Sequence, residues 1–550
     1  MNDAPDIDLF RRLTELNQIG IALSREKDIA RLLEAILVAA KQITNADGGT
    51  LYRKYGDELR FEIILNDSLG IAMGGTTGKA IPYPPIKLYD DDGRPNNSMV
   101  VAYSVLHDQT VNIADAYTEQ GFDFSGTKSF DSKTGYRSKS FLTVPMKDHQ
   151  DEVIGVVQLI NAKERASDAI VPFSLADQNL AESLASQAAV ALTNQLLIKQ
   201  LEELFESFIN LINAAIDDKS PYTGGHCQRV PMLTMMLAEA AHRANTGPLA
   251  DFAMSEKDRY ELKIAGMLHD CGKVTTPVHV VDKATKLQTI YDRIGLIDTR
   301  FEVLKRDAEI KVLKAKLQGL ERGNKSTWVQ LDMRLSAELA QLDADRDFLR
   351  RCNVGSERMA PEEQERVSSV ASGYRWRDTG GNDNAPLLDD DEIKNLTIRS
   401  GTLTEEERKI INHHIEVTIM MLESLPWPRH LKNVPEYAGG HHERMDGKGY
   451  PRGLTRDQMS VQARVMGIAD IFEALTAKDR PYKKGKTLTE ALTILGKFKL
   501  NGHIDPDLFD VFMRERVYLR YAEQFLDAEQ IDTVDLSTIP GVPEDLLARG

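Results

Sequence analysis

Two adjacent histidines, His441 and His442, open the stretch of this chain that is richest in groups able to do chemistry. Glu443 and Asp446 follow, and Gly447–Pro451 closes the stretch. Imidazole is the commonest side-chain metal ligand. Glycine and proline do not continue a helix, so the pattern predicts a helix that carries ligands and runs into a loop at the rim of a pocket. The alternative is a surface helix end with solvated histidines.

Further ligand-type residues lie in apolar surroundings elsewhere in the chain. His269 and Asp270 end one apolar run, and Asp470 ends another. Burying an ionised group is costly unless the group is paired or coordinates a metal. His226 stands at the start of a predicted helix, where capping or packing would equally account for it. Together these residues favour a metal site over solvated histidines.

Length and composition limit the class of protein. The chain has 550 residues, enough for two to four domains, and its net charge is −16. This charge argues against a nucleic-acid polymer or an anionic membrane as the main partner. Three widely spaced cysteines suit a reducing, cytoplasmic location. No run of 18 apolar residues occurs, so we expect no membrane span.

The first third of the chain alternates between helical and strand-like patterns. Two helices are expected within residues 8–45, followed by strands, a short helix and a closing helix, which together make an α+β domain. The strands are expected at residues 50–52, 59–64, 110–113, 141–146 and 153–161, the short helix at 99–106, and loops at 66–80, 88–98 and 115–138.

Residues 174–218 are continuously helical in pattern. Leu197, Leu201, Leu204, Phe208 and Leu211 alternate steps of four and three, as in a coiled-coil seam. A helix of this length exceeds the need of one small domain, so we interpret it as a connector and as the parallel seam of a homodimer. The alternative is an ordinary core helix that breaks midway.

The C-terminal motifs resemble the HD-GYP family of phosphohydrolases, which hydrolyse cyclic di-GMP. The resemblance covers residues 215–285 and 398–515, and it implies an all-α domain with two divalent metal ions. Fe or Mn is favoured, and Mg, Ni or Zn is an alternative. Tyr222 replaces a glutamate that can accompany a third metal, and Glu473 replaces a frequent aspartate. The implied metal ligands are His226, His269, Asp270, His414, His441, His442 and Asp470.

The resemblance also assigns catalytic and substrate-binding roles. Asp270 is expected to bridge both metals, with His226, His269 and Asp470 mainly on one and the remaining histidines on the other. Lys273 would lie one turn beyond His269 and bind phosphate. His413 is expected to be exposed. The implied substrate-binding residues are Lys273, Gly449, Tyr450, Pro451, Arg480 and Lys483.

One spacing departs strongly from the family. His269 and His414 are 145 residues apart, which implies an insertion at about residues 288–397. Its leucine-spaced segments, 290–320 and 328–349, predict an antiparallel helical hairpin with a turn at 319–326. Residues 372–392, rich in Gly, Asp and Asn, are expected to lack regular structure. We expect the insertion to bind a partner or brace a dimer.

Residues 135–178 resemble the second half of a GAF domain. The family order is seen in Val144–Met146, Ile154–Val156 and Leu159–Asn161. A partial nucleotide-binding signature implies a small-molecule ligand, although Ala162 and Gln178 depart from it. The alternative is a dimerising domain without a cyclic nucleotide. The residues that carry the signature are Asn161, Lys163, Phe173 and Asp177.

The sequence therefore predicts a multi-domain protein that hydrolyses cyclic di-GMP to linear pGpG, and GMP remains open as a second product. The alternatives are a catalytically weak cyclic di-GMP receptor and a hydrolase of another cyclic dinucleotide such as 3′,3′-cGAMP. Motifs alone do not separate these substrates. The expected order is a GAF domain at 1–175, a connector at 176–218, HD-GYP segments at 219–287 and 398–550, and the insertion at 288–397.

Overall fold

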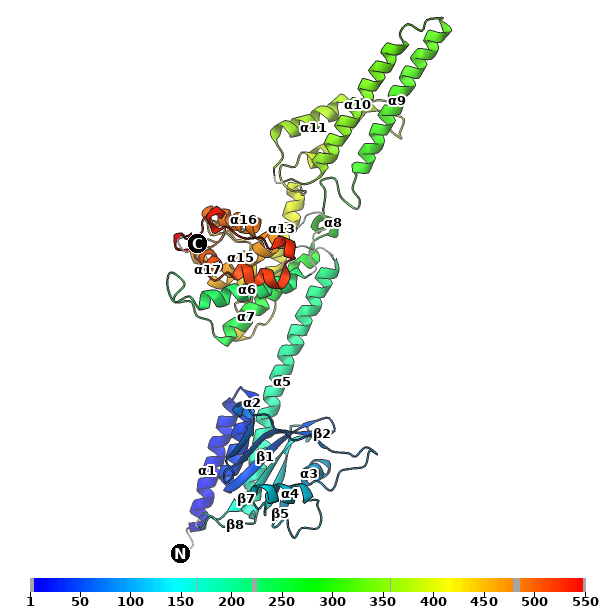
Figure 1. The fold of residues 1–550 in the computed structure, drawn as a ribbon. Coiled ribbons are helices and arrows are strands. Elements are labelled where there is room, and N and C mark those ends of the chain that lie inside the picture. Colours follow the sequence, from blue (N-terminus) through cyan, green and yellow to red (C-terminus); the bar gives the residue numbers. More distant parts are fainter. Residues whose placement is uncertain (1–3, 166, 220–224, 357, 478–484, 548–550) are drawn as a thin grey trace. The chain divides into compact units, whose positions relative to one another are not determined.

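The computed structural model of the chain describes residues 4–165, 167–219, 225–356, 358–477 and 485–547. It divides into two compact units, Met1–Phe205 and Glu206–Gly550. Figure 1 colours the first unit blue to cyan and the second mainly green to red. Among the described helices, none combines the length and the apolar character that crossing a membrane requires.

The first unit is an antiparallel sheet with helices on both faces (Figure 1). Leu51 packs in a cluster with Ile36 and Leu184 on one face, whereas the next residue, Tyr52, packs with Val101 on the other. This alternation follows from the period of two in a strand. The sheet order is β3-β2-β1-β7-β6-β5, with β4 on β2 and β8 on β7. The elements are α1 (Ala4–Arg25), α2 (Ile29–Thr44), β1 (Ala46–Tyr55), β2 (Glu58–Asn66), β3 (Ile71–Gly74), β4 (Ile86–Lys87), α3 (Val100–His107), β5 (Val111–Ile113), α4 (Ser125–Thr134), β6 (Phe141–Lys147), β7 (Val153–Lys163) and β8 (Ile170–Val171).

Two expected loops contain regular structure. Strand β3 lies within residues 66–80, and helix α4 lies within 115–138. Helix α4 has no apolar stripe to reveal it, and Asp131 is its buried residue. The Asp131 carboxylate accepts hydrogen bonds from Tyr117 and from the backbone and side chain of Ser138. A buried polar anchor therefore positions a helix that hydrophobic periodicity does not predict.

Helix α5 runs from Leu175 to Lys219 without a break. Leu184 and Leu192 in its first half are buried in the core of the first unit. Beyond Leu197 the leucines are exposed and no longer buried, since Leu201 is 64% and Leu211 is 65% exposed. The long helix of the prediction is thus present, and its second half leaves an apolar row uncovered by the described chain.

The second unit is almost entirely helical. Capping boxes set several helix starts, because Ser255 with Asp258 and Thr404 with Glu407 satisfy first-turn amides. Gly439 and Gly440 end the short helix that precedes the histidine pair. The helices outside the insertion are α6 (His226–His242), α7 (Glu256–Leu268), α8 (Val278–Val281), α13 (Glu405–Glu423), α14 (Val434–Gly439), α15 (Val461–Thr476), α16 (Leu488–Leu500), α17 (Pro506–Arg514), α18 (Val517–Phe525) and α19 (Glu544–Leu547).

The insertion contains the expected hairpin and more. Helices α9 (Ile294–Glu321) and α10 (Trp328–Asn353) pack against each other (Figure 1). Two further helices, α11 and α12, build a small core with the base of the hairpin around Phe301 and Leu349. The segment expected to lack regular structure instead pairs two short strands and begins a capped helix. These elements are α11 (Pro361–Gly373), the ladder β9 (Arg375–Trp376) with β10 (Ala385–Pro386), and α12 (Asp390–Leu396).

Candidate metal centre

Seven histidine and aspartate side chains from five places in the second unit converge. His226 begins α6, His269 and Asp270 follow α7, His414 lies on α13, the histidine pair follows α14, and Asp470 lies on α15. Five of the seven residues are buried, and His442 and Asp470 are half-buried. The convergence includes every metal ligand that the resemblance implied, across the large insertion.

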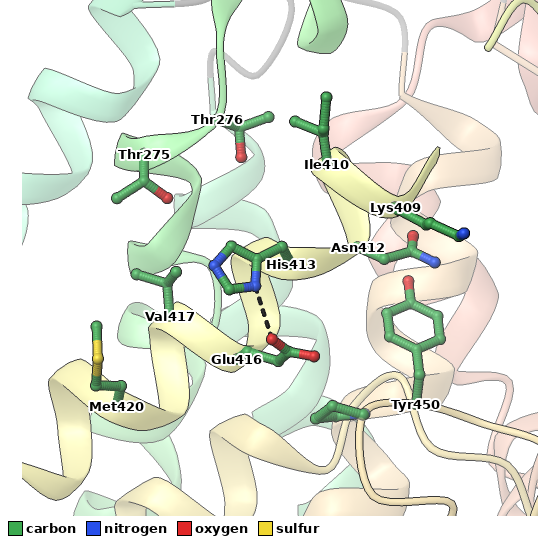
Figure 2. A pocket seen from close by; sticks show the side chains of 11 residues that line it. Thr275, Thr276, Lys409, Ile410, Asn412, His413, Glu416, Val417, Met420 and Tyr450 are labelled. Carbon is green, nitrogen blue, oxygen red and sulfur yellow. Dashed lines mark hydrogen bonds and ion pairs between the residues drawn. The ribbon is translucent and has the colours of Figure 1, made fainter. Parts of the chain in front are cut away.

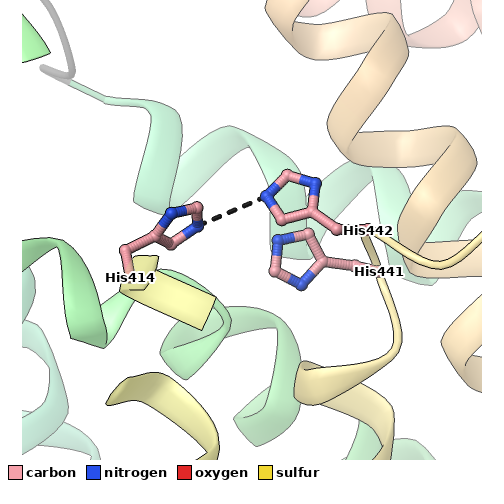
Figure 3. A group of neighbouring side chains, drawn as sticks. All are labelled: His414, His441 and His442. Atoms are coloured by element: carbon pink, nitrogen blue, oxygen red, sulfur yellow. Dashed lines mark hydrogen bonds between the residues drawn. The ribbon is translucent and has the colours of Figure 1, made fainter. Parts of the chain in front are cut away.

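The donor atoms form two groups that meet at Asp270. One group is His226, His269 and Asp470, and the other is His414, His441 and His442 (Figure 3). Within each group the donor atoms lie within 4.8 Å of one another. Asp270 Oδ2 lies 3.1 Å from His226 Nε2, and Asp270 Oδ1 lies 3.4 Å from His414 Nε2. One carboxylate thus faces both groups, as a bridging ligand would.

Backbone carbonyls orient three of the imidazole rings in the same way. The Nδ1 atoms of His269, His414 and His441 each contact the carbonyl three residues earlier, at Gly266, Ile411 and Ala438. Nδ1 therefore donates, and each Nε2 keeps its lone pair. His414 Nε2 and His442 Nε2 lie 3.3 Å apart (Figure 3). Facing lone pairs repel unless a cation or a proton lies between them, so the arrangement suits a metal.

Two buried atoms of the centre have no hydrogen-bond partner in the described chain. They are His441 Nε2 and Asp270 Oδ1. An unsatisfied buried acceptor costs about 1–3 kcal/mol. Both atoms point into the donor groups given above, so coordination would satisfy them. The donor set therefore fits two first-row divalent ions.

Burial and neighbouring charges set the protonation of these donors. Burial, with a smaller effect of His269, lowers the pKa of His441 to about 4. Burial also lowers the pKa of His442 well below its usual value. Burial opposes ionisation of Asp270, but Lys273 and His269 outweigh it and hold the Asp270 pKa well below the ordinary range. Neutral imidazoles and an ionised carboxylate are the forms that bind metals.

Glu473, which sequence reasoning noted only as a departure, lies directly against His226. Its buried carboxylate contacts Nδ1 of His226 and accepts a hydrogen bond from Arg229 at 2.7 Å. A carboxylate on the far ring nitrogen orients a ligand histidine and raises its basicity. Glu473 follows Asp470 by three residues on α15, so both face the same way. That spacing is the signal that could have identified it.

Two local expectations are wrong. The histidine pair was expected on a helix, but α14 ends at Gly439, and His441 and His442 lie in the turn that follows. Lys273 was expected one α-helical turn beyond His269, but α7 ends at Leu268 and a 3₁₀ turn, Cys271–Thr275, replaces it. Gly272 lets this turn pack directly on α13, because a Cβ at this position would lie 2.0 Å from the His414 carbonyl oxygen. The tighter turn brings the Lys273 ammonium onto Asp270 instead.

The Gly-Tyr-Pro segment lies against the centre. The Tyr450 ring stacks on the His442 ring, with centroids 4.8 Å apart. A Cβ at Gly449 would lie 2.4 Å from the Glu443 Cα and from the Arg444 nitrogen, so only glycine allows this approach. The buried Glu443 carboxylate accepts hydrogen bonds from two backbone amides just beyond Pro451. Glu443 thus fixes the loop and does not act as a ligand.

A cavity of about 670 Å³ adjoins this loop (Figure 2). Tyr450 and Pro451 line one wall, and α13 lines another. Figure 2 shows Lys409, Asn412 and Tyr450 gathered on one side, with His413 hydrogen-bonded to Glu416 beside them. His413 is exposed, as expected, and also lines this cavity. The expected substrate-binding residues Arg480 and Lys483 lie outside the described residues.

Two family models match the chain, one in each of its two compact units. The GAF domain family matches residues 28–192, and an HD domain family matches residues 390–508. The chain carries a GAF domain and an HD domain. The HD match contains His414, His441, His442 and Asp470.

Curated relatives match part of the chain. A cyclic di-GMP phosphodiesterase of Pseudomonas aeruginosa is 37% identical over 21% of this chain and 27% of its own length. A 3′3′-cGAMP-specific phosphodiesterase of Vibrio cholerae is 44% identical over 15% of this chain and 19% of its own length. A cyclic di-GMP phosphodiesterase of Thermotoga maritima is 34% identical over 24% of this chain and 35% of its own length. The chain therefore spans about a fifth to a third of these relatives.

Solved structures match about a third of the chain. A GAF domain of a Coxiella burnetii phosphotransferase is 12% identical, covers 35% of this chain and 98% of its own, and has a TM-score of 0.27. A GAF domain/HD domain protein from Geobacter sulfurreducens is 16% identical, covers 32% of this chain and 98% of its own, and has a TM-score of 0.23.

The four residues of the nucleotide-binding signature each have partners within the fold of the GAF domain. Asn161 is fully buried and bonds Tyr136 and the backbone of residues 137–140. Lys163 pairs with Asp47, Phe173 lies in the core, and Asp177 caps α5 through Ser174. Each residue therefore has a role within the fold, and a ligand site formed by these residues stays a prediction.

Proposed function

We propose that the chain is a metal-dependent phosphodiesterase that hydrolyses cyclic di-GMP to linear pGpG. The observation that carries the proposal is the pair of three-donor groups joined by Asp270. Phosphodiester anions resist attack by water, and an enzyme needs concentrated positive charge at the phosphate. The cyclic dinucleotide substrates named for the relatives carry two such diesters.

One divalent ion would be held by His226, His269 and Asp470, and the second by the three histidines of Figure 3. Asp270 would contact both. When bound, two such ions activate water and neutralise charge on the phosphate. Mixed imidazole and carboxylate donors favour Fe or Mn over Ca, and we propose Fe or Mn.

The chain's own residues would position the substrate beside the centre. Asp270 and Asp470 outweigh the effect of burial and raise the pKa of Lys273, so its ammonium stays charged. Lys273 can bind a phosphate oxygen while it remains on Asp270. Tyr450 presents a ring and Lys409 a second cation along the adjoining cavity, which suits a nucleotide with a base and a phosphate. The protein's charge of −16 makes these local cations necessary.

Turnover of purified, metal-loaded protein against a panel of cyclic dinucleotides tests the proposal. Cyclic di-GMP should be opened to pGpG, with elemental analysis near two metals per chain. GMP appearing later would identify a second product. Tight binding without any product would instead support the receptor alternative.

Hydrolase activity on 3′,3′-cGAMP is the second candidate. The observation that favours it is the 44% identity to a relative named for that substrate. The same panel decides between the two, because preference is the ratio of kcat/KM values. A preference for 3′,3′-cGAMP above about tenfold would replace the first assignment.

We further propose that the chain is a homodimer joined through α5 and regulated by the GAF domain. The support is the uncovered row of Leu201, Leu204, Phe208 and Leu211, which follows coiled-coil spacing. In a parallel seam equivalent residues meet, so Leu204→Cys should form a disulfide-linked dimer under mild oxidation. Inserting one to four residues into α5 should change basal activity, because each turns the helix by about 100°. Unchanged activity across the series would make the connector passive.

A further inference from the structure

Helix α9 of the insertion has a second apolar face that the chain leaves uncovered. Its first face packs on α10, where Ala308 and Val312 are buried. Its second face, which we call the outer seam, is exposed over about half of each side chain. The outer seam consists of Ile310, Leu313, Leu317 and Leu320, which are 46%, 63%, 57% and 48% exposed.

The spacing of the outer seam is that of a coiled coil. Its steps are three, four and three, which are the a and d positions of a heptad. Scattered exposed leucines are ordinary, but a continuous apolar row marks an interaction surface. The seam spans three helical turns, so it fits the side of another helix.

Charges beside the seam indicate which helix. Lys314 and Glu321 occupy e positions, and neither forms an ion pair within the described part of the chain. On the opposite flank, Glu309 pairs with Arg306 at 2.7 Å and Lys316 pairs with Asp332. The free charges are thus of opposite sign and on one side of the seam.

An antiparallel pairing of two copies of α9 uses these free charges. In antiparallel coiled coils the e positions face each other, so Lys314 would meet Glu321 of the partner subunit, and the reverse pair would form by symmetry. A parallel pairing would place Lys314 opposite Glu309, which is already engaged. The antiparallel arrangement therefore pairs both free charges, Lys314 and Glu321.

We infer that the outer seam binds the outer seam of a second copy of this chain in antiparallel register. The inference rests on the homodimer proposed above, because a three-turn seam is short and gains from copies that are already tethered. In this register Leu313 faces Leu317 of the partner subunit. The insertion then braces the dimer at a second place.

Disulfide trapping of the full chain tests the register. The chain's own three cysteines are buried, so mild oxidation should act on introduced ones. Leu313→Cys with Leu317→Cys should give a covalent dimer, whereas Leu313→Cys alone should not. The matched control is Gln318→Cys with Arg322→Cys, which has the same spacing at exposed positions that lie off the seam and off its e flank. Trapping by the single variant, or equal trapping by the control, would overturn the inference.

Charge reversal tests the partner contacts. Lys314→Glu in the trapping background should slow dimer formation about two- to fivefold, the scale of a surface ion pair, and adding Glu321→Lys should restore the rate. If Leu204→Cys in α5 gives a dimer but the α9 pair does not, the homodimer stands and this inference fails. If neither gives a dimer, both proposals fail.

Discussion

Two polar clusters built around buried side chains, one in each unit, differ in how far the protein itself satisfies them. In the GAF domain, Asp47 accepts from Ser68, Tyr136 and Lys163, and Tyr136 in turn accepts from Asn161. We call these five residues the Asp47 cluster. In the metal centre, by contrast, His441 Nε2 and Asp270 Oδ1 have no hydrogen-bond partner in the described chain.

This difference separates structural from chemical use of the same residue types. A buried group whose hydrogen bonds are complete stabilises the fold and has nothing left to offer a ligand. Buried acceptors that face one another without donors cost stability unless something binds between them. Both clusters carry motif residues, so the motif alone does not distinguish them. The remaining hydrogen-bonding capacity does.

The largest expected effect is loss of the carboxylate that faces both donor groups. Asp270→Ala should remove both metals and lower turnover well over 100-fold, since even residues behind the ligands cost about 10–100-fold. Elemental analysis and steady-state kinetics on the same preparation measure it. Two metals retained in the variant would show that Asp270 does not bridge, and the proposed centre would fail.

Glu473 gives a smaller effect because it acts through His226. Glu473→Gln should weaken metal binding at that group about 10–100-fold, leaving the three histidines of the other group loaded. The matched control is Glu416→Gln, which breaks a glutamate–histidine pair at the exposed His413. Competition with a chelator compares the two variants. Equal metal affinity in both would mean that Glu473 serves only packing.

Substitution in the Asp47 cluster should lower the stability of the GAF domain and leave the metal content unchanged. Burial opposes ionisation of Asp47, but hydrogen bonds from Lys163, Tyr136 and Ser68 outweigh it and lower the Asp47 pKa below 3.8. Its contribution is therefore present above pH 3.8 and is lost as pH falls through the lower, folded value. Asp47→Asn should destabilise the GAF domain by about 1–3 kcal/mol at pH 7, and less in acid.

Thermal unfolding of the full chain across pH 3–7 measures this difference. The control is Asp108→Asn, which loses a pair with Lys147 in which the two side chains are 43% and 39% exposed. Its effect should stay within about 1 kcal/mol. If the stability lost in Asp47→Asn were the same at every pH, altered packing and not a lost charge would be its cause.

The sequence predicted the helices that have a regular apolar periodicity and the site whose residue types are those of metal ligands. Periodicity located α5 and the α9–α10 hairpin, and the ligand types identified the centre although His269 and His414 lie 145 positions apart. Periodicity could not find α4, which is held by one buried carboxylate. It also extended α7 too far, because the turn around Gly272 packs closely on α13, which is distant in sequence.

The smallest effect is expected at His413, and it is informative because His414 is its neighbour. The two differ by about 100° around α13. His414 is buried with Nδ1 on Ile411, whereas the side chain of His413 is 61% exposed and bonds Glu416. His413→Ala should keep both metals, and KM should change by no more than about threefold, the scale of a weak exposed contact at the cavity wall. His414→Ala should lose the metal of its group. Metal loss in His413→Ala would show that the helix presents the other histidine to the centre, and the orientation of the second donor group would then be wrong.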